Sequence, residues 1–174
     1  SMQFETEELV EIRRAVRALC EDFPGEYWRA KDAAREYPGE FVDALTKAGF
    51  LAALIPEEFG GSGLSLDAAA VIMEEIQATG CNGSSAHAQM YIMNTLLRYG
   101  SDEQKREYLP RIATGELRLQ AFGVSEPTSG TDTLSLKTRA VKEGDEYVVS
   151  ILRNKIKLEE QAAKSDVLEI ERDG

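Results

Sequence analysis

The sequence predicts an α+β protein, in which a helical N-terminal domain over residues 1–118 is followed by a β-rich domain over residues 119–174. Two observations predict this division. Apolar residues recur at spacings of three and four through most of the first half, which is the period of amphipathic helices. After Gly115 apolar and polar residues alternate, which is typical of strands with one buried face. A chain of 174 residues is long enough for two small cores.

Signals for helix ends divide the first half into a series of helices. Pro38 suits the first turn of a helix, and Gly49 and Gly80 can adopt the left-handed conformation that ends one. Ser101 and Gln104 form the capping box S-x-x-Q. The expected helices run from Thr6 to about Leu19, from Trp28 to Glu36, from Pro38 to Gly49, from Ser65 or Asp67 to Gly80, from about Ser84 to Tyr99, and from Ser101 to Pro110 or one turn further to Ala113.

Apolar faces of these helices supply the expected core. The third helix is predicted to bury Phe41, Leu45 and Ala48, which recur at spacings of four and three. The first helix carries a similar stripe, made of Leu9, Ile12, Val16 and Leu19.

The second half is predicted to be rich in strands. "LRLQAFGV", residues 117–124, reads as a first strand, and "LSLKTRAVKEGDEYVVS", residues 134–150, reads as a hairpin. The turn of this hairpin is expected at Glu143-Gly144-Asp145, between two runs of β-forming residues. Strict alternation predicts two further strands at residues 155–159 and 168–171.

Composition and charge exclude several classes of protein. The chain has 20 basic and 31 acidic residues, a formal charge of -11, so a nucleic-acid partner is not expected without a basic cluster. No run approaches the roughly 20 apolar residues of a membrane helix. Cys20 and Cys81 are far apart in the sequence and only one histidine is present, which predicts neither a zinc site nor a disulfide framework. We expect a cytoplasmic protein, because the first residues contain neither a signal h-region nor a transit peptide.

Two features of the helical half admit a functional and a structural interpretation. "LIPEEFGGSGLS", residues 54–65, has the glycines of a phosphate-binding loop, but it lacks the strand-GxGxxG-helix context, so a turn between helices is favoured. His87 lies among apolar residues of its helix, and a hydrogen-bonded core histidine is favoured over a catalyst.

The most unusual stretch is "GVSEPTSGTDTLS", residues 123–135, which leaves the first predicted strand at Val124 and enters the next near Leu136. Gly130 allows backbone N–H groups to approach a ligand closely. Hydroxyl groups are unusually dense, at Ser125, Thr128, Ser129, Thr131 and Thr133. This chemistry suits a polar, partly anionic ligand, whereas the alternative is a Ser/Thr-rich turn without a ligand.

Residues 123–132, GVSEPTSGTD, closely resemble the signature of the acyl-CoA dehydrogenase family. Neighbouring stretches resemble the same family in the same order, namely "GFLAALIPEEFGGSGLS", "YGSDEQKREYLPRIATGE" and "LKTRAVKEGDEYVV". The resemblance covers about residues 4–149. It implies three parts: a helical domain, a middle β barrel, and a C-terminal four-helix bundle that we expect this chain to lack, with the cofactor FAD between the last two parts.

The resemblance also implies roles for individual residues. Phe122, Val124 and Ser125 are expected along the flavin ring, with the Ser125 hydroxyl at its pyrimidine edge. Gly130 and Thr131 are expected to face the FAD pyrophosphate and the thioester substrate, so Thr131 is also a predicted substrate contact. The acidic residues Glu126 and Asp132 are expected to orient the loop and not to catalyse.

The reaction that the resemblance implies is α,β-dehydrogenation of an acyl-CoA, in which a carboxylate removes a proton and the flavin accepts a hydride. No residue of this chain matches the family's catalytic glutamate, so none is assigned as catalytic. Lys157 and Glu159 stand where the family has an aromatic residue and a hydroxyl. Two readings therefore remain: an FAD-dependent enzyme, whose family members act on acyl-CoA and form homo-oligomers, or an altered fragment with a structural or binding role and no flavin.

One helix resembles the wall of the family's acyl pocket. Its residues would serve equally well in an ordinary hydrophobic core, and we favour the core. The residues concerned are His87, Gln89, Met90, Met93 and Asn94.

Overall fold

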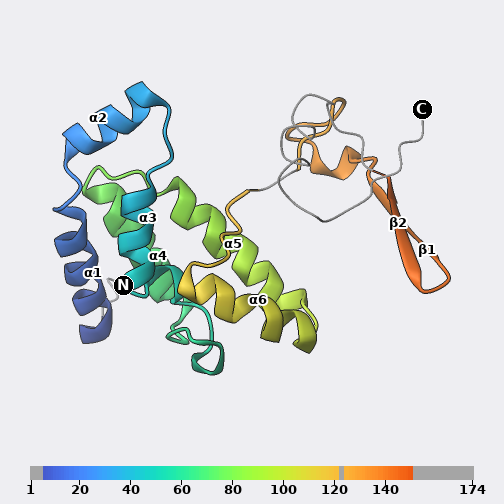
Figure 1. Cartoon of the computed structure of the whole chain (residues 1–174), viewed down its shortest axis with the longest axis horizontal. Coiled ribbons are helices and arrows are strands. Elements are labelled where there is room, and N and C mark those ends of the chain that lie inside the picture. The colour runs from blue at the N-terminus through green and yellow to red at the C-terminus, as the bar shows by residue number, and fades with distance from the viewer. Residues whose placement is uncertain (1–5, 122–123, 151–174) are drawn as a thin grey trace, which may run out of the picture. The chain divides into compact units, whose positions relative to one another are not determined.

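The computed structural model describes residues 6–121 and 124–150 of the chain, which divides into one unit of residues 1–122 and a second of residues 123–174 (Figure 1). The first unit is helical. Its helices are α1 (Glu7–Cys20), α2 (Gly25–Ala34), α3 (Gly39–Lys47), α4 (Leu66–Ala78), α5 (Ser84–Tyr99) and α6 (Asp102–Thr114), with short 3-10 turns at η1 (Phe50–Ala52) and η2 (Glu57–Phe59).

Side-chain caps begin three of these helices, as their sequences require. The hydroxyls of Thr6 and Ser65 accept hydrogen bonds from the N–H groups of Leu9 and Ala68, each at 3.3 Å. At α6 both bonds of the predicted capping box form: the Gln104 N–H donates to the Ser101 hydroxyl at 3.2 Å, and the Ser101 N–H donates to the Gln104 side chain at 2.9 Å. These contacts satisfy amide groups that have no partner within the helix.

The core of the helical unit has two parts. In the first, α1 packs along α4, and α3 and the start of α5 complete the cluster (Figure 1). Phe41 lies at its centre and meets Phe23 and Trp28 edge-to-face, with ring centroids 5.1 Å and 4.9 Å apart. In the second part, α5, α6 and the two 3-10 turns bury Ala52, Ile55, Met93, Leu109 and Ile112.

The predicted helix at residues 28–36 was displaced along the chain. The helix α2 begins at Gly25 directly after Pro24, and it ends before Arg35, whose left-handed conformation (φ 54°) stops the helix. The prediction that α3 buries Ala48 was also wrong. The helix ends at Lys47, so Ala48 is exposed and Val42 is buried beside Phe41 in its place.

The strand predicted over residues 117–124 is not formed at residues 117–121, which form neither a helix nor a strand and pair with no strand of the described residues. Its alternation has another cause. Leu117 and Leu119 pack against the second part of the core. Arg118 donates to the hydroxyl of Thr46 at 3.0 Å and forms an ion pair with Asp43. The segment is therefore fixed to the helices by its side chains.

The second unit contains the predicted hairpin. The strand β1 (Arg139–Glu143) pairs antiparallel with β2 (Glu146–Ser150), and Gly144, with φ 64°, lies in the two-residue turn. The first strand begins later than predicted, because residues 133–135 form the 3-10 turn η3 (Thr133–Ser135). The predicted strands at residues 155–159 and 168–171, with Lys157 and Glu159, lie outside the described residues. The complete barrel and the absence of a bundle stay predictions, as does the domain boundary after residue 118.

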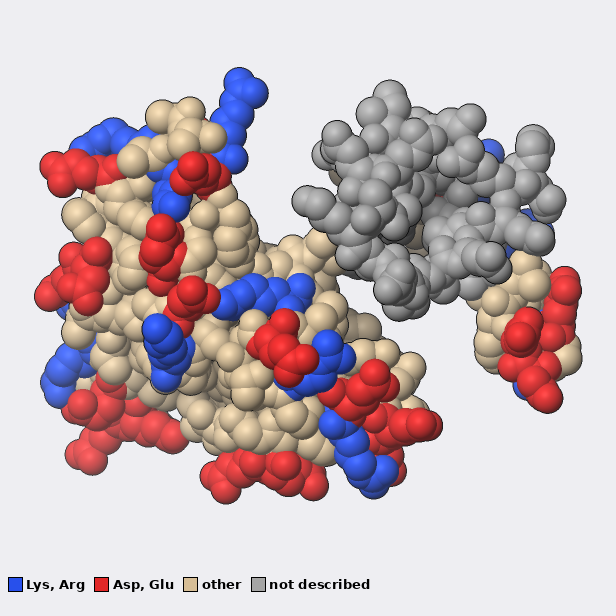
Figure 2. Space-filling view, in the orientation of Figure 1, with Lys and Arg blue, Asp and Glu red and all other residues tan. Residues whose placement is uncertain are grey.

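Charged side chains of both signs are interspersed over the face of the helical unit that Figure 2 shows. Within residues 6–121 and 124–150 no helix is both long enough and apolar enough to cross a bilayer.

Candidate functional site

Glu126 anchors the loop that carries the predicted site residues. Its side chain is only 9% exposed. Its carboxylate accepts hydrogen bonds from the backbone N–H of Lys137 at 2.7 Å, from the N–H of Thr138 at 2.8 Å, and from the Thr138 hydroxyl. The Thr138 hydroxyl first, and then the Lys137 amide, hold the pKa of Glu126 below its ordinary value. A buried carboxylate with this many donors ties the start of the loop to the residues that lead into β1.

A tight turn follows the anchor. Glu126 and Ser129 form an antiparallel bridge, with N···O distances of 2.9 Å and 3.2 Å in the two directions. The buried Ser129 hydroxyl donates to the carbonyl of Asp132, and the Ser135 hydroxyl donates to the Asp132 carboxylate. Both acidic residues of the loop are thus engaged in holding its shape, which agrees with the prediction that they orient it.

The remaining donors of the loop are exposed and unused. Ser125 and Gly130 flank the bridge on its two sides, and Thr131 follows. The hydroxyls of Ser125 and Thr131 and the N–H groups of Gly130 and Thr131 make no hydrogen bond within the described part of the chain. A Cβ placed on Gly130 would meet no atom within 4 Å, so the backbone there is open to close approach. Neutral donors grouped in this way suit an anionic or carbonyl-bearing ligand.

The other predicted cofactor residues are only partly located. Val124 is half-buried beside Ser125. Phe122 lies outside the described residues, so its predicted place along the flavin ring stays a prediction. Among the residues that the structure describes, no group of three or more His, Cys, Asp or Glu side chains could hold a metal ion.

In the glycine loop of the helical unit, the N–H groups of residues 60–64 all donate to carbonyls within residues 52–57 and are not free for a phosphate. The N–H groups of Ser62, Gly63 and Leu64 donate to carbonyls of residues 52–55 at 2.7–3.2 Å. Gly61 lies so close to Ile55 that a Cβ there would be 2.0 Å from the Ile55 carbonyl oxygen. The loop is therefore a turn packed on its own backbone, as the favoured interpretation predicted.

The helix α5 divides its predicted pocket residues between the core and a cavity. Gln89, Met90 and Met93 are buried, as expected for core residues. His87 is exposed, with its ring edge-to-face against Tyr91 at 5.1 Å, so the prediction of a core histidine was wrong. His87 lies on the side of α5 that faces away from the core. A cavity of about 420 Å³ beside the helix is lined by Leu54, Leu66, Ala69, Ala70, Met73, His87, Met90, Tyr91 and Asn94.

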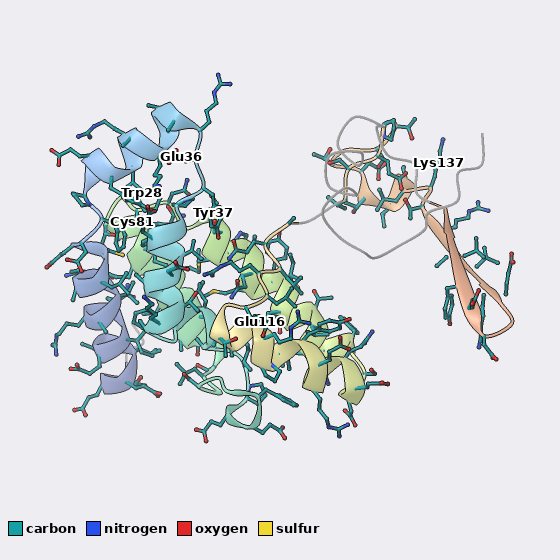
Figure 3. The ribbon with its side chains drawn as sticks, in the orientation of Figure 1. Trp28, Glu36, Tyr37, Cys81, Glu116 and Lys137 are labelled. Atoms are coloured by element: carbon teal, nitrogen blue, oxygen red, sulfur yellow. The ribbon has the colours of Figure 1, made fainter. Side chains whose placement is uncertain are left out.

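Sequence reasoning missed a hydrogen-bond chain within the helical unit. The Gln120 side chain donates to Gln89 at 2.9 Å and accepts from the Tyr37 hydroxyl, while Gln89 donates to the Leu51 carbonyl at 3.4 Å (Figure 3 labels Tyr37). This series of hydrogen bonds fixes the segment that precedes Phe122 to the helical unit. No local signal could have found it, because Gln120 reads as the polar side of a strand.

Comparison with known proteins gives a consistent result for the first two thirds of the chain. The sequence profile of the family described as "Acyl-CoA dehydrogenase, N-terminal domain" matches residues 6–116. Acyl-CoA dehydrogenase FadE12 of Mycobacterium tuberculosis is 32% identical over 146 residues, which are 83% of this chain and 37% of that protein. The (2S)-methylsuccinyl-CoA dehydrogenase of Cereibacter sphaeroides is 38% identical over 147 residues, which are 82% of this chain and 26% of that protein.

A solved structure agrees with these sequence relatives. The crystal structure of an acyl-CoA dehydrogenase complexed with FAD from Bacillus anthracis matches with a TM-score of 0.69 and 28% identity, over 86% of this chain and 27% of that one. This chain spans at most 37% of the length of these related proteins. The profile nevertheless covers well over half of the chain, and the chain belongs to the acyl-CoA dehydrogenase family.

Proposed function

We propose that this chain carries the helical domain and the flavin-facing loop of an FAD-dependent acyl-CoA dehydrogenase, which oxidises an acyl-CoA thioester to the α,β-unsaturated product. The observation that carries the proposal is the loop of residues 124–135. Its buried Glu126 fixes the backbone, while the donors of Ser125, Gly130 and Thr131 stay exposed and unpaired. Because these donors are exposed, a ligand can bind them without breaking any contact within the protein.

The donor set fits FAD. The Ser125 hydroxyl would donate to the pyrimidine edge of the flavin, with Phe122 and Val124 along the ring. The N–H groups of Gly130 and Thr131 would donate to the pyrophosphate, and Thr131 would also meet the thioester substrate. Because the hydrogen bonds of Glu126 order the loop before a ligand binds, little conformational entropy is lost on binding. Bound FAD supplies the hydride acceptor of the reaction.

The apolar cavity beside α5 is the part of the helical unit that suits a hydrocarbon chain. Its volume of about 420 Å³ lies in the range of small-molecule sites. Met73 and Met90 are adaptable apolar side chains that follow the shape of a flexible ligand. His87 and Asn94 add polar groups at the same cavity, and they would favour substrates with a polar group along the acyl chain.

The catalytic base is not assigned to this chain. In the proposed enzyme it is supplied by the four-helix bundle, which also covers the flavin. The alternative is a fragment that keeps the fold and has a structural or binding role without flavin. Binding of FAD by the loop distinguishes the two functions.

The decisive experiment is an FAD titration of the purified chain, followed by the flavin absorption band and by quenching of flavin fluorescence. We expect saturable binding, and Ser125→Ala should weaken it about tenfold because one hydrogen bond to the flavin is lost. Thr128→Ala is the matched control, since Thr128 is an exposed hydroxyl of the same loop without an assigned contact. Equal weakening by both variants would contradict the residue assignment, and no binding at all would favour the flavin-free alternative.

A further inference from the structure

The two cysteines of the chain, 61 positions apart in the sequence, meet in the folded helical unit. Cys20 is the last residue of α1, and Cys81 lies in the segment between α4 and α5. The Cys81 Sγ is 3.9 Å from the carbonyl oxygen of Cys20 and 3.7 Å from that of Phe23. Both thiols are free, and each residue is only 3% exposed. The Cys81 side chain therefore lies directly against the end of α1.

The two thiols differ in their access to solvent. Cys81 lines a cavity of about 770 Å³ that opens between α2 and the start of α5, together with Trp28, Lys31, Gln77, Asn82 and Ser84. Figure 3 shows Trp28 and Cys81 beside each other below α2. Cys20 is not among the residues that line this cavity. A small reagent that enters the cavity reaches Cys81 first.

Burial and neighbouring side chains set the acidity of the Cys20 thiol. Burial raises the pKa of the Cys20 thiol to about 11, a hydrogen bond with Thr79 opposes this shift, and Cys81 adds to it through its charge and a hydrogen bond between the two thiols. At neutral pH Cys20 is thus mostly protonated, and it reacts more slowly with an oxidant than a thiol of ordinary pKa would. It is placed to react with an already oxidised Cys81 and poorly placed to react with an oxidant itself.

We propose that Cys20 and Cys81 are a site of oxidative modification, at which a small hydroperoxide oxidises Cys81 and Cys20 then closes an intramolecular disulfide. In the first step the Cys81 sulfur takes one oxygen from hydrogen peroxide, forming a sulfenic acid and releasing water. In the second step the Cys20 thiol gives up its proton as its sulfur attacks the Cys81 sulfur, the S–O bond breaks, and the hydroxyl leaves with that proton as a second water. The two thiols lose two electrons and two protons, and the peroxide is reduced to two waters.

The disulfide would join the end of α1 to the segment that leads into α5. It would close a loop of about 60 residues, which restricts the unfolded chain strongly. The midpoint of thermal unfolding should then rise by at least about 5 °C relative to the reduced protein. Reduction with a dithiol reagent should reverse the rise.

The test treats the reduced, folded full chain with millimolar hydrogen peroxide and measures its intact mass, its free thiols after unfolding, and its peptide map. The expected product is a monomer lighter by two hydrogen atoms, with Cys20 and Cys81 in one cross-linked peptide pair. Unchanged thiols, oxygen addition without a cross-link, or dimers linked between chains would each overturn the proposal. The same treatment in guanidinium shows whether the folded contact is needed, and equally fast cross-linking there would also overturn it.

Single variants test the order of the two steps. In Cys20→Ser the remaining Cys81 should gain an oxygen atom and form no disulfide. In Cys81→Ser the remaining Cys20 should lose its free thiol at least about tenfold more slowly than Cys81 does in the first variant. Equal rates would contradict the assignment of Cys81 as the first thiol to react. Because the unsubstituted chain carries the main test, the proposal does not depend on how well either variant folds.

Discussion

Different kinds of contact stabilise the helical unit, residues 1–122, and the second unit, residues 123–174, which we call the loop unit. Every buried apolar residue that the structure describes lies in the helical unit, from Val16 to Ile112. In the described part of the loop unit the buried residues are Glu126 and Ser129, both polar. Burial of apolar surface therefore stabilises the first unit, whereas hydrogen bonds to a carboxylate shape the second. In its described part, the predicted flavin loop therefore owes its shape to local polar contacts and not to a core of its own.

The largest effect is expected from breaking the apolar core. Phe41→Ala should lower the free energy of unfolding of the helical unit by about 4 kcal/mol, because it leaves a cavity and removes two edge-to-face aromatic contacts. Urea unfolding followed by circular dichroism measures this loss. Leu66→Ala is the control, since Leu66 is 69% exposed and its loss should cost less than about 0.5 kcal/mol. Similar losses in both variants would contradict the assignment of the core.

The next effect is expected at the buried ion pair between α1 and α4. Glu75, 1% exposed, accepts from Arg13 at 3.0 Å and from Arg17 at 2.6 Å. Glu75→Gln should lower the free energy of unfolding by about 2 kcal/mol. The loss should be smaller than for a fully buried ion pair, because the side chain of Arg17 is 61% exposed. Glu11→Gln is the control, because the pair between Glu11 and Arg14 is exposed at both ends.

The same residue predicts a pH dependence. The Arg17 hydrogen bond first, and that of Arg13 with it, holds the pKa of Glu75 below 4.5, its ordinary value. A lowered pKa in the folded state gives stability that is present above pH 4.5 and is lost as the pH falls below it toward the folded-state pKa. Thermal unfolding between pH 7 and pH 3 should therefore show a shallower acid decline in Glu75→Gln than in the unsubstituted chain. An unchanged slope would show that other groups carry the decline.

A smaller effect on stability is expected where residues 117–121 contact the helices. Gln120→Ala leaves the amide of the buried Gln89 without one partner and should cost about 1 kcal/mol of unfolding free energy. Tyr37→Phe removes only the exposed end of the same chain of hydrogen bonds and should cost less. If Tyr37→Phe were the more damaging variant, Gln89 would not be the centre of this contact.

The smallest effect on global stability, and the sharpest test of the comparison, is expected at Glu126. Glu126→Gln replaces one carboxylate oxygen by an NH2 group, and since the amides of Lys137 and Thr138 donate to different oxygens, at least one of them should exchange with solvent deuterium faster. The unfolding of the helical unit should not change. Glu143→Gln, at an exposed position of β1, is the matched control and should leave both amides protected. A lower unfolding midpoint of the helices in Glu126→Gln would show that the two units are not stabilised separately.

Local sequence signals predicted the helical unit well because its boundaries are set by local contacts. The bounds of α5 were correct, and the capping box of Ser101 and Gln104 forms as expected. The error at residues 117–121 has the opposite origin. Alternation there records contacts with helices far away in the sequence, among them Asp43 and Gln89, and a periodic pattern cannot distinguish them from a strand.

The candidate site could be located from the sequence, but its internal contacts could not. The density of hydroxyls and glycine marked residues 123–135, and the resemblance to the family gave Glu126 its orienting role. The donors that Glu126 accepts from, at Lys137 and Thr138, lie more than ten positions further along, in a stretch that predicted a hairpin and gave no sign of these contacts. The contacts of Ser125, Gly130 and Thr131 with a cofactor stay predictions. The meeting of Cys20 and Cys81 was likewise invisible, because it depends on how α1 packs against α4.

Among the residues that the structure describes, the buried apolar side chains end at Ile112, which has a consequence for the order of events during synthesis. A ribosome releases the N-terminal part of the chain first, and domains generally fold as units once they emerge. The buried apolar side chains of the helical unit leave the ribosome before the loop with Ser125 and Thr131 does, because they precede it in the chain. The nascent helices can therefore begin to bury their apolar surface before the predicted cofactor loop emerges, so packing of the helical core does not have to wait for that loop.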